Sequence, residues 1–242
     1  MILFYTNNIK NDIAELPEEE AMHCVKTLRK KVGDAIQFVD GQGNWYKGTI
    51  IGTSKKAVSI SIKSVVSEYE KRNHHLHIAI APTKNINRFE WFLEKATEFG
   101  IDEITPLLCF HSERKNVRED RLEKVVMAAM KQSLKAYLPQ INPMISFKDF
   151  LKSVDIGESQ YENQKFIAHC QDDFSESKFH LKNAAKERQN ITILIGPEGD
   201  FSSKEIELAL SQNFQPISLG KERLRTETAG LAACHIVNLV NS

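Results

Sequence analysis

The sequence predicts an α/β protein in two parts, a small β-rich domain followed by a domain built on a mostly parallel sheet. From residue 74 onward, short apolar runs alternate with amphipathic stretches of helical period, which is typical of a parallel sheet. Between residues 35 and 66 the chain instead reads as consecutive short strands. We therefore expect one domain at residues 1–70 and a second at residues 74–242.

The first domain is predicted to be a small β-barrel with one helix. Strands are expected over residues 35–40, 45–51 and 57–66, and Gly41-Gln42-Gly43-Asn44 supplies a hairpin turn between the first two. A helix over residues 18–31 precedes them and ends in a basic cluster that includes Arg29 and Lys30. The charged, proline-free stretch 67–73 is the expected linker.

The second domain is predicted from alternating strands and helices. Strands are expected at residues 76–81, 104–109, 166–170, 191–195 and 216–219. Helices are expected over residues 87–99, where Gly100 ends the helix, and over residues 120–137. Two further helices should begin near Ser203 and at Thr226, which is a natural N-cap.

Two strand-to-helix loops near the C-terminus are the most informative segments. The first is Gly196-Pro197-Glu198-Gly199, which follows the apolar run 191–195. Its glycines let the backbone turn sharply and approach a ligand, while the proline fixes one φ angle. Ser202 and Glu205 then form a capping-box pattern that predicts a helix start.

The second loop follows the same plan. Leu219-Gly220 closes a short strand, and Arg223 and Arg225 come just before the helix that begins at Thr226. Ligands usually bind at the carboxyl ends of parallel strands, so the two loops predict one pocket with backbone walls. Neither a phosphate-loop motif nor G-x-G-x-x-G is present. Taken alone, a G-x-x-G turn also fits a purely structural role.

Bulk properties exclude several classes. Lys plus Arg and Asp plus Glu both number 32, so any nucleic acid must be held by local basic patches. The four cysteines lack a C-x-x-C pair, which favours reduced thiols over a zinc site or disulfides. His74, His75 and His77 lack a metal-site spacing, so no metal is expected. Without a signal peptide or a membrane-length apolar run, we expect a cytoplasmic protein that does not enter a membrane.

The two loops together carry a family resemblance. Gly-Pro-Glu-Gly at 196–199, followed by Leu219-Gly220 and Leu224-Arg225-Thr226-Glu227-Thr228-Ala229, resembles the C-terminus of the SPOUT methyltransferases. Within them the chain is similar to the 16S ribosomal RNA uridine-N3 methyltransferase (RsmE) family. The similarity extends over nearly the whole chain. It also covers Val32-Gly33-Asp34, Phe38-Val39-Asp40-Gly41, residues 84–106, Ser112-Glu113-Arg114 and Gln132.

The resemblance implies a fold, an activity and partners. The first domain would be a PUA-like RNA-binding domain, and the second would form an α/β trefoil knot and pair as a homodimer. The activity implied is methyl transfer from S-adenosyl-L-methionine to N3 of a uridine in 16S rRNA of the small ribosomal subunit. Two alternatives stay open: a SPOUT methyltransferase for another RNA site, and a non-catalytic RNA-binding ribosome-assembly factor.

Site residues follow from the matching motifs. Uridine N3 carries a proton, so a base or a cation that stabilises the deprotonated uracil must lie within reach. Arg225 is the expected stabiliser, and Glu198 is a candidate for base or for cofactor binding. Glu227 fits a helix first-turn acid and a catalytic role equally well. The expected cofactor-binding residues are Ile195, Gly196, Pro197, Glu198, Gly199, Leu219, Gly220, Leu224, Arg225 and Thr226.

A set of basic residues predicts an RNA track, although each alone also fits an ordinary solvated charge. They are Arg29, Lys30, Lys84, Arg88, Arg114 and Lys115. The chain also departs from the family pattern. Asp200 stands where another glycine is common, and Glu222 stands at an often basic position. Ala128 and Lys131 replace acidic residues around Gln132, so roles at these positions are open.

Overall fold

The computed structural model describes residues 2–54, 56–154, 163–171 and 178–242. The chain divides into two compact units, Met1–Lys71 with Met127–Leu138, and Arg72–Val126 with Pro139–Ser242. The second unit thus begins inside the stretch 67–73, and the segment 127–138 is counted with the first unit.

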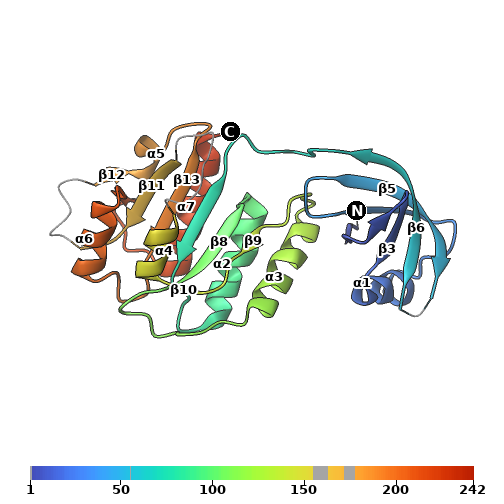
Figure 1. Ribbon diagram of the computed structural model, residues 1–242, viewed down its shortest axis with the longest axis horizontal. Helices are drawn as coiled ribbons and strands as arrows, with labels where there is room; N and C mark the ends of the chain where they lie inside the picture. Colours follow the sequence, from blue (N-terminus) through green and yellow to red (C-terminus); the bar gives the residue numbers. More distant parts are fainter. Residues whose placement is uncertain (1, 55, 155–162, 172–177) are drawn as a thin grey trace. The chain divides into compact units, whose positions relative to one another are not determined.

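The first unit is a curled six-stranded sheet (Figure 1). All its pairs are antiparallel except the parallel pair of β1 and β4. The Thr6 hydroxyl donates to the Glu15 carbonyl at 2.5 Å, which draws the chain after β1 toward β3 and curls the sheet into a half-barrel. The strands, in spatial order, are β1 (Phe4–Tyr5), β4 (Ala35–Val39), β5 (Trp45–Thr53), β6 (Val58–Val66), β3 (Ile13–Leu16) and β2 (Ile9–Lys10).

The helix predicted over residues 18–31 is shorter than expected. α1 (Glu18–Met22) continues only as a π-helical turn, η1 (His23–Thr27). Arg29 has a φ of 54°, a left-handed conformation that a helix does not contain, so the predicted extension to Lys31 is wrong. The helix lies on a core formed by Phe4, Ala14, Leu16, Ala21, Cys24, Ile36, Phe38, Ile50, Val58 and Ile60.

The helix α3 (Glu119–Gln132) ends five residues before the predicted end at Tyr137. Leu134 has a φ of 57°, and the chain beyond it pairs with the hairpin turn of the first unit. The Gly43 amide donates to Ala136 at 3.0 Å, and the Leu138 amide donates to Gly41 at 2.9 Å. Lys131, near the end of α3, forms an ion pair with Glu20. The lysine at this family-divergent position therefore has a structural partner.

The second unit contains an eight-stranded sheet in which every strand pair is parallel. All five predicted strands are present, and β11 lies a few residues earlier than predicted. The order is β10 (Ile145–Ser146), β8 (Glu103–Leu108), β7 (Leu76–Ile80), β13 (Asn190–Ile195), β11 (Asn163–Ala168), β14 (Gln215–Ser218) and β12 (Phe179–His180), with β9 (Gln140–Ile141) beside β8.

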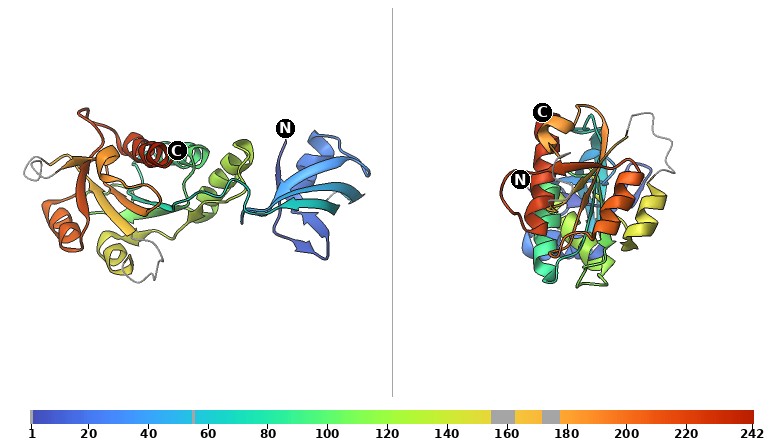
Figure 2. Two further views of the ribbon diagram at one scale, coloured as in Figure 1. Left: turned by 90° about the horizontal axis from the view of Figure 1, so that it is seen from above. Right: turned by 90° about the vertical axis from the view of Figure 1, so that its left-hand side faces the viewer.

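Helices cover both faces of this sheet. α2 (Ile86–Phe99) and α7 (Thr226–Val240) pack against each other on one face, and α4 (Phe147–Ser153) and α6 (Ser203–Ser211) lie on the other (Figure 2). A short helix, α5 (Leu181–Ala184), follows β12. The strands β7 and β13 are buried along nearly their whole length, as expected for central strands covered on both faces.

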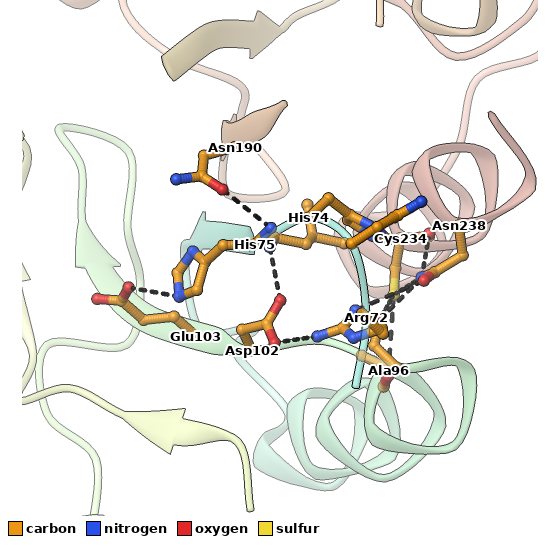
Figure 3. A network of polar contacts seen from close by, with 12 residues as sticks. Arg72, His74, His75, Ala96, Asp102, Glu103, Asn190, Cys234 and Asn238 are labelled. Atoms are coloured by element: carbon orange, nitrogen blue, oxygen red, sulfur yellow. Dashed lines mark hydrogen bonds and ion pairs between the residues drawn. The ribbon is translucent and has the colours of Figure 1, made fainter. Parts of the chain in front are cut away.

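A polar network at the amino edge of the sheet fixes the start of the second unit (Figure 3). Arg72 donates to the Gly100 carbonyl at 2.7 Å and forms an ion pair with Asp102. Asp102 also accepts from the Leu76 amide at 2.7 Å, and Asn238 of α7 donates to the same Gly100 carbonyl at 2.8 Å. The network therefore joins the entry to β7, the end of α2 and the end of α7.

The histidines near this edge have structural partners. His77 is buried and its Nε2 lies 2.8 Å from the Thr105 hydroxyl, while His75 and His77 both face Glu103 at 3.6 and 3.7 Å. Among the described residues, no group of three or more His, Cys, Asp or Glu is suited to hold a metal ion. Within the same residues, none of the helices has the length and apolar character needed to cross a membrane.

Burial lowers the pKa of His77 to about 4, against the opposing influence of Glu103. The unfolded chain therefore binds a proton between pH 6.5 and 4 that the folded chain excludes. We predict that the free energy of unfolding falls as pH drops through this window, by up to roughly 1.4 kcal/mol per pH unit from this side chain. Urea unfolding between pH 7.5 and 5 should show a shallower pH dependence for His77→Gln.

The matched control is His75→Gln, because His75 is about half exposed. The free energy of unfolding of this variant should depend on pH in nearly the same way as that of the wild type. Equal slopes for the two variants would contradict a special role of the buried imidazole.

Candidate active site

The two loops singled out from the sequence meet at the carboxyl edge of the parallel sheet. They follow β13 and β14, which lie on either side of β11. The Thr226 hydroxyl, at the start of α7, donates to the Gly196 carbonyl at 3.1 Å, and this bond is buried. The two loops are therefore joined directly into one structure.

The backbone conformation of the first loop explains why an aspartate is tolerated at position 200, where the family pattern commonly has glycine. Asp200 has a φ of 62°, a region that favours glycine and that aspartate tolerates better than most residues. Its amide donates to the Pro197 carbonyl at 2.9 Å. Its carboxylate accepts from the amides of Phe201 and Cys170, each at 2.8 Å. Asp200 thus keeps the turn and also ties it to the end of β11.

The glycines of the first loop lie close to neighbouring side chains. A Cβ at Gly196 would lie 3.1 Å from the Phe201 ring, and one at Gly199 would lie 3.0 Å from Cβ of His111. The capping box of Ser202 and Glu205 is present as predicted and starts α6 at Ser203. A side chain at Gly199 would therefore press on His111.

Among the glycines of the two loops, Gly220 has the backbone conformation that favours glycine. Gly220 has a φ of +135°, where other residues are strained, and a Cβ there would meet no atom within 4 Å. The N-cap of α7 is Arg225, one residue before the predicted Thr226. Thr226 is therefore the first residue of α7 rather than its cap, and its hydroxyl donates to the Gly196 carbonyl.

A cavity of about 750 Å³ lies between the two loops. Nine of the ten predicted cofactor-binding residues line it, and Gly199 does not. The nine are Ile195, Gly196, Pro197, Glu198, Leu219, Gly220, Leu224, Arg225 and Thr226. Glu222, at the second divergent position, also lines it.

A third wall of the cavity comes from the end of β11 and was missed from the sequence. It is formed by Ala168, His169, Cys170, Gln171 and Lys178. Lys178 donates to the carbonyls of His169 and Gln171, at 3.1 and 2.9 Å. The predicted strand 166–170 was the sequence signal that could have identified this wall, because its carboxyl end lies at the same edge of the sheet as the two loops.

The ionisable side chains at the cavity differ in their burial and in their protein partners. Burial, assisted by Lys178, lowers the pKa of His169 to about 4, so this imidazole is neutral at pH 7. The Arg225 side chain is exposed and, among the described residues, its guanidinium has no hydrogen-bond or ion-pair partner. Arg225 is therefore a cation available to a ligand in the cavity.

Glu198 links the first loop to a neighbouring basic segment. Its Oε1 accepts from the Lys84 amide at 2.9 Å. Arg114 donates to the carbonyls of Thr83 and Lys84, at 3.0 and 2.6 Å. The Lys84 side chain pairs with Glu113 at 2.7 Å, and this contact raises the pKa of Lys84. The structure thus brings together Glu198, Lys84 and Arg114 beside the cavity.

The other predicted residues lie outside the cavity lining. Arg88 of α2 faces the buried Glu227 at 3.9 Å, and one Glu227 oxygen has no hydrogen-bond partner. In the first unit, Arg29 is exposed and Lys30 donates to the Ala35 carbonyl at 2.9 Å. Lys115 is exposed.

Both parts of the chain match known protein families. Residues 70–238 match the RNA methyltransferase domain family, and residues 16–63 match the RNA methyltransferase PUA domain family. A PUA domain followed by an all-parallel α/β domain with a cavity at its carboxyl edge defines the class of RNA methyltransferases.

Individual relatives indicate which family of RNA methyltransferases the chain belongs to. The chain is 31% identical over 237 residues to the ribosomal RNA small subunit methyltransferase E of Rickettsia conorii, covering 96% of this chain and 92% of the relative. A probable rRNA-methyltransferase from Porphyromonas gingivalis superposes with a TM-score of 0.89 at 37% identity, covering 100% and 98% of the two chains. The chain belongs to the ribosomal RNA small subunit methyltransferase E family.

One similar structure was solved with its cofactor. The putative methyltransferase from Legionella pneumophila, in complex with bound S-adenosylmethionine, superposes with a TM-score of 0.84 at 25% identity. The superposition covers 99% of this chain and 98% of that chain.

The bond between the loops generates a stability prediction. Thr226→Val keeps the shape of the side chain but leaves the buried Gly196 carbonyl without its donor, which costs roughly 1–3 kcal/mol. Urea unfolding at pH 7.5 should therefore show a lower midpoint. Thr228→Val, at an exposed position two residues further along, should change the free energy by less than about 0.5 kcal/mol. Similar losses in the two variants would argue against this bond as a stabilising contact.

Proposed function

We propose that the protein transfers a methyl group from S-adenosyl-L-methionine to N3 of a uridine in the 16S rRNA of the small ribosomal subunit. The observation that carries the proposal is the cavity between two joined loops, in a chain of the methyltransferase E family. The cofactor-bound relative from Legionella pneumophila supports the choice of methyl donor.

The residues at the cavity fit this cofactor. A cavity of about 750 Å³ has the size of ordinary small-molecule sites. Its walls combine backbone groups of the glycine-bearing loops with apolar side chains such as Ile195 and Leu224, which suits an adenosine moiety. The Gly220 position leaves open space where a Cβ would project. When bound, the cofactor supplies an electrophilic methyl group on a sulfonium.

The reaction requires that uridine N3 lose its proton. In this proposal Arg225 stabilises the negative charge that develops on the uracil, because its guanidinium lies at the cavity without a partner among the described residues. Glu198 holds Lys84 through Oε1, and its Oε2 makes no hydrogen bond with a described residue. That oxygen is the proposed acceptor of the N3 proton. Methyl transfer then depends mainly on positioning.

RNA would be held by local cations, since the net charge of the chain is zero. We assign Lys84, Arg88, Arg114 and Lys115 to contacts with RNA phosphates near the cavity, and Arg29 and Lys30 to contacts from the PUA-like unit. The domain division at residues 1–70 and 74–242, a cytoplasmic location and metal-independent chemistry belong to the same proposal.

The quaternary structure and the knot are also proposed. Large apolar side chains are exposed on α2 and α7, namely Trp91, Phe99 and Leu239, which supports a homodimer through this helical face. The resemblance to SPOUT methyltransferases supports a trefoil knot that includes the second loop and α7.

The direct test uses small ribosomal subunits from cells in which this gene is deleted. We expect the purified protein to transfer labelled methyl groups from S-adenosyl-L-methionine to their 16S rRNA, and nucleoside mass spectrometry to identify N3-methyluridine. A methylated nucleoside of another kind would favour the alternative RNA methyltransferase. Failure to bind the methyl donor in calorimetry would favour a non-catalytic assembly factor.

A substitution separates catalysis from binding. Arg225→Ala should lower kcat at least a hundredfold while changing the affinity for S-adenosyl-L-methionine only a few fold, because the charge acts on the transition state. Arg223→Ala removes a neighbouring exposed cation and should lower kcat much less. Equal losses of affinity and turnover in Arg225→Ala would make Arg225 a cofactor-binding residue.

A further inference from the structure

Phe110 is an aromatic side chain displayed to solvent next to the candidate active site. It is 77% exposed, the highest value among large apolar side chains in the described part of the chain. It follows β8, so it lies at the same carboxyl edge of the sheet as the two loops. Burial of a phenylalanine side chain is favourable, so the exposure of this ring to solvent needs an explanation.

The backbone that carries Phe110 is fixed by specific hydrogen bonds. The Phe110 amide donates to Oε1 of Glu205 at 2.8 Å, and Glu205 is also the capping-box acid of α6. The Ser112 hydroxyl accepts from the Cys109 amide at 3.0 Å, and the Ser112 amide donates to the Cys109 carbonyl at 3.1 Å. The ring is therefore held out on an ordered turn.

The same turn packs against the first loop of the cavity. Nδ1 of His111 lies 3.0 Å from the Asp200 carbonyl, so this nitrogen carries the proton and donates. The His111 and Phe110 rings contact edge to face, with centroids 5.0 Å apart. His111 also covers Gly199 closely. The loop 196–200 therefore both lines the cavity and contacts His111.

Basic residues follow this aromatic pair in the chain. Arg114 donates to the Lys84 carbonyl, and Lys115 is exposed and makes no ion pair with any described residue. An exposed ring on the same segment as basic residues matches single-stranded RNA, in which bases stack on aromatic side chains while phosphates contact Lys and Arg. The apolar surface is a single ring among polar neighbours, too small for a stable protein interface.

We propose that Phe110, braced by His111, is a stacking platform for an unpaired nucleobase that flanks the methylated uridine. The proposal rests on the proposed function, because it places the RNA strand along the outer side of the loop 196–200. It predicts that the ring contributes to RNA recognition and not to binding of the methyl donor.

The test compares Phe110→Leu and Phe110→Ala with Phe110→Trp. Loss of the ring should raise both the KM and the Kd for small subunits from the deletion strain roughly five- to fiftyfold, as expected for loss of one base-stacking contact. Phe110→Trp should stay close to the wild type. Affinity for S-adenosyl-L-methionine, the unfolding midpoint and the sedimentation coefficient should not change in any variant.

The control is Phe179→Ala, which removes another exposed phenylalanine. Phe179 lies in β12, the last strand in the sheet order on the side away from β8. It should leave RNA affinity unchanged. Wild-type RNA affinity in Phe110→Leu would overturn the platform, as would a change of oligomeric state in Phe110→Ala, which would make the ring a subunit contact. If the wild type binds subunits without methylating them, the proposed function fails, and the Kd series still decides the role of Phe110.

Discussion

The candidate site depends on the buried hydrogen bond from the Thr226 hydroxyl to the Gly196 carbonyl. The two loops follow strands that are not neighbours in the sheet, because β11 lies between β13 and β14. β11 pairs with both strands, and the bond from Thr226 joins the loops themselves beyond the ends of the strands. The bond starts from the first residue of α7, whose N-cap, Arg225, makes no side-chain capping hydrogen bond. The start of α7 is thus attached to the first loop by a long-range contact.

Other contacts hold the cavity walls in the same manner, with side chains bound to backbone groups of distant segments. Asp200 ties the first loop to the end of β11, and Glu198 ties it to Lys84. Glu205 ties the start of α6 to Phe110. These carboxylates accept from amides, so they stiffen the loops, and the Arg225 guanidinium has no partner among the described residues. A preorganised wall that carries a cation is what stabilisation of a developing negative charge requires.

Much of this architecture was predictable because its signals are local. Apolar runs and helical periodicity predicted the five main strands of the parallel sheet, and Ser202 with Glu205 predicted the start of α6. Strands of two residues, such as β9, β10 and β12, have no period of their own and exist only because a neighbour pairs with them. The early end of α3 has the same cause, since residues 136 and 138 bond to the turn at Gly41 and Gly43.

The site was predictable in part for the same reason. Glycine and proline mark the two loops, so nine residues of the cavity lining were identified from sequence. The wall at His169 and Lys178 was missed because it comes from a different segment with no motif. Asp200 appeared to break the pattern, yet its positive φ and its bond to Cys170 show an aspartate replacing glycine in the same turn.

The most direct measurement is a crystal structure of this protein with S-adenosyl-L-methionine. The account predicts electron density for the donor between the residues 195–200 and 219–226, in contact with their main-chain atoms. Density for the donor at any other place, with the space between the loops empty, would contradict it.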